Sequence, residues 1–134
     1  MPLVNNDTVG AITRTRIAAW AAQSEYTEEV AMADAATLQT AKQVIDRKIF
    51  TQTPTAARAV TTPTAALIVG YATGYVVGTS FEFTIVNKAA ATHAITLTAG
   101  VGVTLVGLAT VAATLSGTWI VRIDSASAVS MFRK

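Results

Sequence analysis

The chain has 134 residues, of which 51% are hydrophobic and only 13% charged, and its formal net charge is +2 at pH 7. This composition excludes a disordered chain, and the lack of cysteine excludes disulfides and thiolate metal sites. Lys and Arg are scattered without a run of three, so the sequence does not predict the basic patch of a nucleic-acid-binding protein.

The length is that of one domain, or of one small domain with an arm. The charged fraction is about half of that in ordinary soluble proteins. Too few charges remain to cover the surface of a monomer in the usual way. We therefore expect apolar surface to be hidden against a partner subunit.

Two weakly polar runs, residues 65–78 and 101–115, raise the question of a membrane. Both are shorter than the roughly 18–20 residues that a spanning helix needs, and glycines interrupt both. The sequence therefore predicts no membrane partner. Residues 1–10, MPLVNNDTVG, have no basic segment followed by an apolar one, so no secretory signal is predicted either.

Residues 1–10 have no period and are expected to form an extended arm. Residues 11–23 fit two structures, because alternation from Ile12 to Arg16 suits a strand and the run IAAWAA suits a helix. A helix is predicted for residues 34–50, with Asp34 as the N-cap. Its apolar stripe would consist of Leu38, Ala41, Ile45 and Ile49.

Residues 51–64 contain Pro54 and Pro63, and the near-repeat Thr-Pro-Thr-Ala-Ala begins in this segment at residues 53 and 62. Each proline favours extended geometry before it and removes a backbone donor. The segment is predicted to be an edge strand or an extended connector.

Strand patterns dominate from residue 65 onward. Leu67, Val69 and Tyr71 share one parity, and the clearest alternation is SFEFTIVN at 80–87, with Phe81, Phe83 and Ile85 on one face. Further strands are predicted in 94–99, 100–107, 109–116, 117–124 and 128–134.

Six or seven short strands at spacings of about 8–12 residues indicate a mainly β fold, namely an antiparallel jelly-roll or sandwich-like domain. It would be preceded by the arm and the helix. The outward positions are mostly Thr, Ala and Val, whereas a monomeric sandwich charges its outer faces and edges. The pattern again favours contact with copies of the same chain.

The stretch from Val86 to Gly107 holds one Lys, one His and no acid. It is predicted to be a loop followed by two strands, and it contributes inward residues to a core or to a subunit interface. Those residues are Ile95, Leu97, Val101, Val103 and Leu105.

Candidate chemical groups are few. His93 is the only histidine, and we interpret it as a loop residue rather than as a base or ligand. Glu28 and Glu29 are adjacent, so they do not face each other on a helix as a carboxylate pair would have to; Asp34 or Glu82 could supply a second acid.

The glycine-rich runs match neither a dinucleotide nor a phosphate loop, and no G-x-S-x-G elbow occurs. We interpret these glycines as turns and bulges. The sequence therefore predicts no catalytic residue, no metal site and no cofactor.

Four aromatic residues could stack on a sugar: Trp20, Tyr71, Tyr75 and Trp119. Trp119 shares the parity of Val121 and Ile123, which favours a core position. Tyr71 and Tyr75 lie near glycine-rich turns and are the better candidates for a contact surface.

Residues 51–134 resemble the C-terminal segments of tailed-phage virion structural proteins. The resemblance rests on the runs TPTAARAVTTPTAALIV, GTSFEFTIVNKAAATHAITLTAGVGVTLVG and SGTWIVRIDSASAVSMFRK. These comprise a Phe-rich strand ending in Val-Asn, an Ala/Thr loop, Ile-Thr-Leu and a Gly-x-Gly-Val-Thr strand. Such proteins include capsid decoration (cement) proteins, which are often trimeric β-proteins that bridge major capsid subunits with an N-terminal arm.

The resemblance implies a homotrimeric decoration protein on the capsid surface of a virion. Its partners would be the major capsid protein and itself. Residues 1–50 would clasp the shell, and residues 51–134 would form the trimer. The expected interface residues are Leu3, Val4, Ile12, Ile17, Trp20, Tyr71 and Tyr75.

Two alternatives remain. The first is a fibre or receptor-binding module that uses Tyr71 and Tyr75. The second is a small hydrolase in a β fold, which the missing catalytic patterns disfavour.

Overall fold

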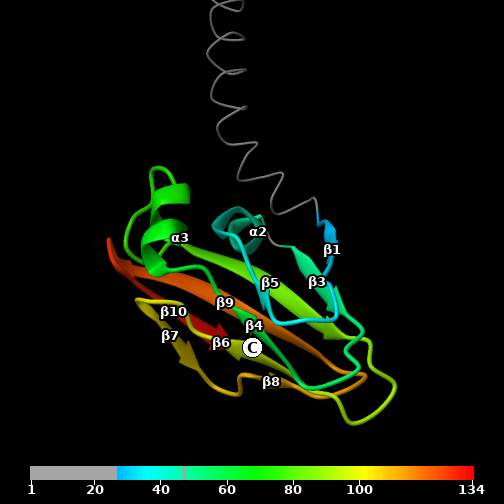
Figure 1. Ribbon diagram of the computed structural model, residues 1–134. Coiled ribbons are helices and arrows are strands. Elements are labelled where there is room, and N and C mark those ends of the chain that lie inside the picture. Colours follow the sequence, from blue (N-terminus) through cyan, green and yellow to red (C-terminus); the bar gives the residue numbers. More distant parts are fainter. Residues whose placement is uncertain (1–26, 47) are drawn as a thin grey trace, which may run out of the picture.

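Figure 1 shows the computed structural model of the chain, which describes residues 27–46 and 48–134. These residues form ten strands and two helices. The strands are β1 (Glu29–Ala31), β2 (Thr37–Leu38), β3 (Ile49–Gln52), β4 (Arg58–Thr61), β5 (Ser80–Asn87), β6 (Ile95–Thr98), β7 (Val103–Val106), β8 (Thr110–Val111), β9 (Ser116–Ser125) and β10 (Ala128–Arg133). The helices are α2 (Ala41–Ile45) and α3 (Ala65–Tyr71).

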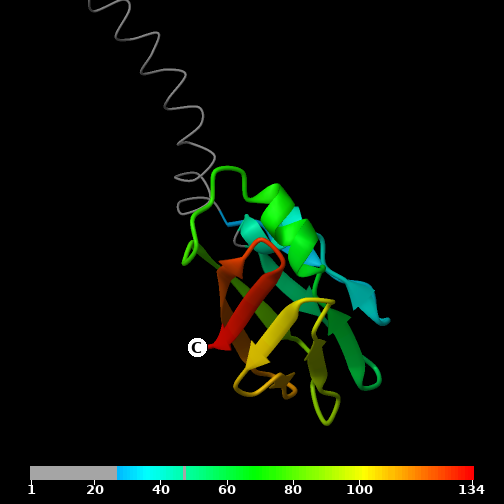
Figure 2. The same cartoon turned by 90° about the vertical axis from the view of Figure 1, so that its left-hand side faces the viewer.

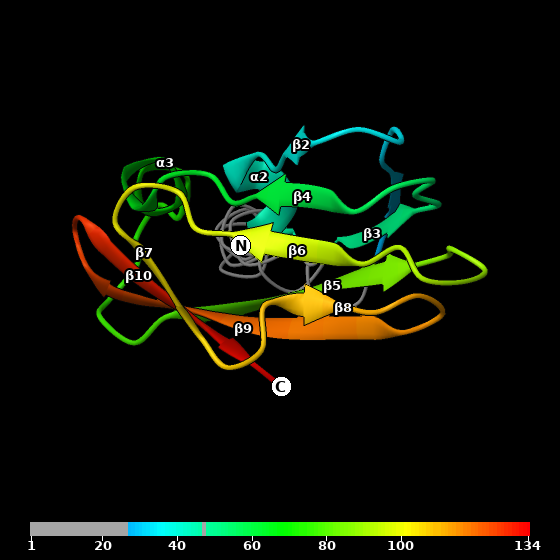
Figure 3. The ribbon, with the colours of Figure 1, turned by 60° about the horizontal axis from the view of Figure 1, so that its bottom comes forward.

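The strands form two sheets that enclose one core, as the view in Figure 3 shows. The large sheet has six strands in the order β1-β3-β5-β9-β10-β7, and the small sheet has four in the order β2-β4-β6-β8. From β1 to β9, successive strands alternate between the two sheets. The chain therefore winds around the core as a coil.

Strands one turn of this coil apart pair in parallel: β1 with β3, β3 with β5, β2 with β4, and β4 with β6. The later strands differ, because β9 runs antiparallel to β5 and β10, whereas β7 pairs with β10 in parallel. The mainly β prediction is confirmed. The expected antiparallel arrangement is wrong, since both sheets are mixed, and a jelly-roll topology is not confirmed.

The physical reason is the way in which successive strands are connected. An antiparallel sheet joins neighbouring strands by short hairpins, whereas parallel neighbours need a crossover. Here the crossover passes through the opposite sheet. The predicted division at residue 50 falls inside β3, and residues on both sides of it share the large sheet.

The largest core side chains lie on β3, β5 and β9 of the large sheet. Phe81, Phe83 and Ile85 are buried on β5, as their alternation predicts. Trp119 is buried on β9, where its ring stacks on Phe83 with centroids 5.5 Å apart. Phe50 on β3 meets Phe83 edge to face at 5.9 Å. These contacts confirm the predicted core position of Trp119.

Both helices lie at one end of the coil, where the chain passes from the small sheet to the large one (Figure 2). We call this the helical end; it comprises α2, α3 and the turns 72–79 and 99–102. The opposite end, formed by the turns 32–36, 53–57, 88–94 and 112–115, is the turn end. None of the described helices is long and apolar enough to cross a membrane.

The predicted helix over residues 34–50 is wrong for most of its length. The helix begins after Thr40, whose hydroxyl accepts from Gln43 N at 3.2 Å while Gln43 Oε1 accepts from Thr40 N at 3.0 Å. This capping box defines a five-residue helix. Leu38 lies in β2 and is exposed, because pairing of β2 with β4 overrides the helical pattern.

The predicted strand at residues 67–71 is also wrong, because these residues belong to a helix. Thr64 Oγ1 accepts from Leu67 N at 3.3 Å and starts α3. Ala65, Ile68 and Val69 are buried on it, which is a helical spacing that the parity of Leu67, Val69 and Tyr71 concealed.

Most of the remaining strand predictions are confirmed, but the strand predicted for residues 109–116 is wrong for most of its length, because only Thr110–Val111 form β8 and a turn follows at 112–115. Residues 51–64 contain the last two residues of β3 and all of β4, joined by the turn at Pro54, so the predicted extended geometry is confirmed; β4 lies inside the small sheet and is not an edge strand. Ile95, Leu97 and Val103 are buried, and Leu105 packs partly against the core. Val101 does not belong to the core: it lies in the turn before β7 and is 82% exposed.

The glycines around Val101 act in the turn, as predicted. A Cβ at Gly100 would stand 2.6 Å from the carbonyl oxygens of Thr62 and Pro63. Gly102 has a φ of +77°, and a Cβ there would stand 2.6 Å from the carbonyl oxygen of Ser127. Only glycine allows these backbone segments to approach so closely.

Candidate interaction surface

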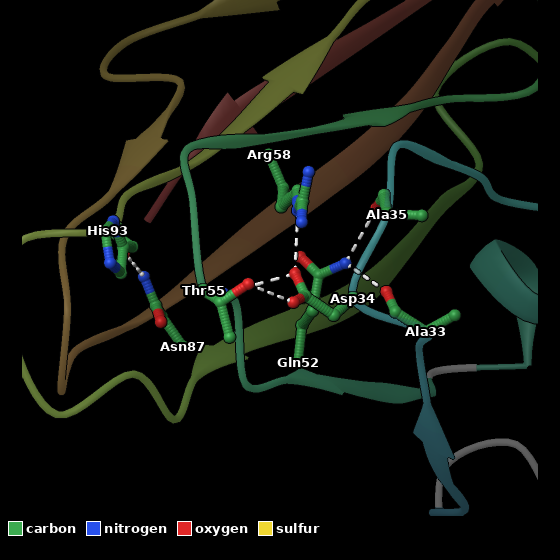
Figure 4. Close-up of polar contacts among 8 residues, drawn as sticks. All are labelled: Ala33, Asp34, Ala35, Gln52, Thr55, Arg58, Asn87 and His93. Atoms are coloured by element: carbon green, nitrogen blue, oxygen red, sulfur yellow. Dashed lines mark hydrogen bonds and ion pairs between the residues drawn. The ribbon is translucent and has the colours of Figure 1, made fainter.

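The turn end carries a network of polar side chains, drawn in Figure 4. The Asp34 carboxylate accepts from Arg58 Nε at 2.7 Å, from the Thr55 hydroxyl at 2.5 Å and from Thr55 N at 3.2 Å. Hydrogen bonds from Arg58 and Thr55 hold the pKa of Asp34 well below its ordinary value. Asp34 therefore links the turn 32–36 to the turn 53–57, one winding further along the coil, and does not cap a helix.

Two buried amide side chains also bind backbone groups at this end of the coil. Gln52 and Asn87 stand in register at the ends of β3 and β5, and each is 1% exposed. Gln52 Nε2 donates to the carbonyls of Ala33 and Ala35 at 2.5 and 2.9 Å. Asn87 Nδ2 donates to the carbonyls of His93 and Val111 at 2.7 and 3.0 Å (Figure 4 shows the first).

The sequence does not predict the role of these amides, because a buried amide residue cannot be distinguished from an exposed one by sequence alone. The only sequence sign is their shared place, at the end of an apolar strand and before a turn. His93 lies in the turn 88–94, as predicted, and Asn87 binds its backbone carbonyl rather than its ring.

The carboxylates considered for catalysis lie in separate ion pairs. Glu28 pairs with Lys48 and Glu82 with Lys134. Glu29 accepts from Lys88 and from Thr51, both at 2.8 Å. Hydrogen bonds from the lysines lower the pKa of Glu28 and Glu29. Among the described residues, no group of three or more His, Asp or Glu side chains could hold a metal ion.

The helical end carries the Lys42–Asp46 ion pair of α2 and also exposes large apolar side chains, as Leu38, Leu108 and Leu115 do elsewhere in the fold. Leu67 and Tyr71 stand one turn apart on α3, exposed by 61% and 43%. Val76 and Val77 follow in the turn 72–79, exposed by 70% and 61%. No charged residue occurs between Arg58 and Glu82 in the sequence. We call Leu67, Tyr71, Val76, Val77 and Val101 the apolar surface.

Hydrogen bonds hold the turn 72–79 in place. Val76 N donates to the Thr79 hydroxyl at 3.0 Å, and Thr79 N donates to the carbonyl of Val76 at 2.9 Å. Gly78 N donates to the carbonyl of Ile123 in β9 at 2.8 Å. The exposed valines are therefore presented by an ordered turn that is tied to the large sheet.

Val101 extends this surface from the neighbouring turn. Its carbonyl accepts from Ala65 N at 2.9 Å, which joins the turn 99–102 to the first residue of α3. Tyr75 is less available than Tyr71, because it packs partly against the core. The structure thus exposes Tyr71, and the predicted contact role of both tyrosines remains a prediction.

A smaller apolar row lies on the outer face of the large sheet. Phe132 on β10 stands in register with Ile120 on β9 and with Val106 on β7. Phe132 and Val106 are partly exposed. The ion pairs Glu82–Lys134 and Arg122–Asp124 also occur on these strands and on β5.

The other predicted interface residues lie outside the described residues: Leu3, Val4, Ile12, Ile17 and Trp20. Comparison of the chain with family models, with curated proteins and with solved structures found no match in any of the three.

Proposed function

We propose that this chain is a non-enzymatic virion structural protein, a decoration protein that binds the outer surface of a phage head as a homotrimer. The observation that carries the proposal is the apolar surface, a set of exposed apolar side chains that α3 and two turns present at one end of the β coil. Exposed apolar groups of this kind mark a place of permanent contact with protein.

The charged groups support the same proposal. Every Asp and Glu side chain in residues 27–46 and 48–134 is in an ion pair. Four of these pairs join residues that are at least 20 positions apart in the sequence, so they hold the coil together. Acid–base catalysis instead needs a positioned group that can exchange a proton with a substrate.

In this proposal residues 1–50 clasp the shell and contact the major capsid protein, as the resemblance implies. The β domain supplies the trimer and stands on the shell. Binding would stabilise the head by adding interface area, which needs neither a cofactor nor a reaction.

The decisive experiment uses heads assembled without this protein. The purified chain should sediment with these heads, and negative-stain images of labelled virions should place the label on the head. A variant that lacks residues 1–20 should keep its oligomeric mass and no longer sediment with heads. Undiminished head binding by this variant would contradict the proposed contact between the arm and the shell.

The alternative is a fibre or receptor-binding module, and the exposed Tyr71 is the observation that favours it. An exposed aromatic ring at the tip of a domain can stack on a sugar. In that case the label would appear on the tail. Tyr71→Ala would then reduce binding to host cells while leaving head binding unchanged.

A further inference from the structure

We propose that residues 11–23 bind the open side of the first winding of the same chain and form hydrogen bonds with its backbone. The first winding is residues 29–39, which comprise β1, the turn 32–36, β2 and Gln39. This inference goes beyond the proposed function. It anchors the predicted arm to the β domain and leaves residues 1–10 to extend toward the shell.

The first winding lies at the edge of both sheets. Among the described residues, β1 pairs only with β3, and β2 pairs only with β4. Figure 3 shows β2 as the outermost strand of the small sheet. An uncovered strand edge is a template for pairing with another chain, and stacked windings need a cap at their end.

On β1, alternate residues direct their backbone groups to opposite sides. The Glu28 carbonyl accepts a hydrogen bond from β3 at 2.9 Å, and Met32 N donates one to β3 at 2.7 Å. Glu29 and Ala31 have the other parity, so they direct their backbone groups away from β3. These groups are donors and acceptors for a further segment.

The chain at β2 shows the same pattern and adds apolar side chains. Gln39 N donates to the carbonyl of Thr61 in β4 at 2.9 Å, so Leu38 directs its backbone groups away from β4. The Leu38 side chain is 70% exposed. Val30 and Met32 are only partly buried against the core. A strand edge with such residues is a place where a further segment gains both hydrogen bonds and apolar contact.

The side chain of Gln39 points to the same conclusion. The residue is 2% exposed, and neither Nε2 nor Oε1 has a hydrogen-bond partner. Thr62 holds the corresponding position one winding further along, and its hydroxyl accepts from Gly100 N at 2.8 Å. Buried amides in native proteins are nearly always hydrogen-bonded. Polar groups of a segment that covers the first winding would be partners for Gln39.

The preceding part of the chain has the length and the position to cover this side. Residues 1–26, which lie outside the described residues, lead directly into the first winding. Register partners in successive windings are 20 positions apart for Glu29 and Ile49, and 23 apart for Thr37 and Val60. The 26 preceding residues are therefore enough for one winding. Their attachment beside β1 also keeps them at an effective concentration of about millimolar order.

Charge complementarity favours residues 11–23 within that part. Residues 27–41 contain three acids and no Lys or Arg. Two of these acids, Glu28 and Glu29, pair with lysines yet keep 51% and 55% of their side chains exposed, so they can accept further donors. Residues 11–23 contain no acid. Their basic residues are Arg14 and Arg16, and their large apolar residues are Ile12, Ile17 and Trp20.

The test is amide hydrogen exchange in the full-length chain, followed by NMR. The amides of Ala31 and Leu38 should be protected in the wild type, because residues 11–23 cover them. In the double variant Ile17→Asp/Trp20→Asp these two amides should exchange about tenfold faster, because the apolar contact is lost.

Two controls accompany this measurement. The variant Leu3→Asp/Val4→Asp adds the same charges within residues 1–10 and should leave the exchange of both amides unchanged. The amide of Phe83 in the central strand β5 reports the stability of the whole fold and should not change in either variant. Equal acceleration at Phe83 would mean general destabilisation and would contradict the inference.

A second measurement locates the contact without weakening it. The chain has no cysteine, so Ala19→Cys/Leu38→Cys introduces its only two thiols. A short bismaleimide should link them within one chain. The matched pair Ala19→Cys/Leu115→Cys uses a leucine that is 57% exposed at the turn end, and it should give little link.

Equal yields for the two cysteine pairs, or unchanged exchange in the Ile17→Asp/Trp20→Asp variant, would overturn the inference. Links formed between isotope-labelled and unlabelled chains would also overturn it, because they would assign the open side to the segment of a neighbouring copy. Neither measurement depends on capsids. If residues 11–23 cover the first winding but the chain does not sediment with heads, the inference stands and the decoration role falls.

Discussion

Two buried amides, Gln52 and Asn87, do much to tie the turns of this fold together. Each stands at the end of a strand and donates two hydrogen bonds to backbone carbonyls: Gln52 to two in the turn 32–36, and Asn87 to His93 in the turn 88–94 and to Val111 in β8. Removing a buried donor leaves its acceptors unsatisfied, at a cost of about 1–3 kcal/mol. Side chains of this kind carry more stability than their small number suggests.

Asn87→Ala should therefore lower the free energy of unfolding by about 1–3 kcal/mol, because the carbonyls of His93 and Val111 lose their donor. Urea unfolding measures the change, with the exposed Thr96→Ala as the control. A loss below about 0.5 kcal/mol, the range of ordinary surface substitutions, would show that water replaces the amide.

The position of the Arg133 side chain depends on the glycine at position 117. Its guanidinium lies 4.5 Å from the ring centroid of Trp119, and a Cβ on Gly117 would collide with it. Gly117→Ala should displace the guanidinium at a cost of about 1 kcal/mol, the size of a cation–π contact.

A double-mutant cycle tests this dependence. Gly117→Ala should cost less in the Arg133→Ala background, because the guanidinium is already gone. Additive losses in urea unfolding would show that the glycine has another role.

At the scale of elements, the sequence predicts strands better than helices. The alternation in β5 and β9 is unambiguous because each strand has one buried and one outer face. In residues 34–50 and 65–71 the apolar spacing fits both periods. The outcome there depends on caps at Thr40 and Thr64 and on pairing with a distant strand, neither of which a local pattern contains.

Helix α3 contains a glycine, Gly70, whose replacement should change the stability of the fold. Gly70→Ala should raise the free energy of unfolding, measured in urea, by about 0.5–1 kcal/mol, since the position is helical and unobstructed. A loss of stability would show that the backbone at Gly70 needs a freedom that alanine does not have.

For the whole molecule, the ion pairs predict sensitivity to acid. Asp34, Glu28 and Glu29 have folded-state pKa values below their ordinary values of 3.8, 4.5 and 4.5. As the pH falls through these ordinary values, the unfolded chain takes up protons first. The stability that the pairs contribute is therefore present above about pH 5 and is lost below it.

Thermal unfolding at pH 7, 5 and 3 checks this prediction. The unfolding temperature should change little between pH 7 and 5 and fall by pH 3. Asp34→Asn should reduce that fall, because its carboxylate no longer contributes. An identical fall in the variant would place the acid sensitivity elsewhere.

The sequence by itself determined the class of the fold, the core face of β5, β6 and β9, the place of Trp119, and the absence of charge from residues 59–81. These properties follow from the local alternation of apolar and polar residues and from composition, which depend only on neighbouring residues. The apolar surface could be predicted only in part: the sequence indicates Tyr71 as a contact residue but places Leu67 in a strand.

Only the tertiary structure decided the parallel winding between two sheets, the register that aligns Gln52 with Asn87, and the gathering of Leu67, Val77 and Val101 at one end. The reason is that strand partners are chosen by contacts between residues far apart in the chain. A strand carries the same alternation whether its neighbour is parallel or antiparallel.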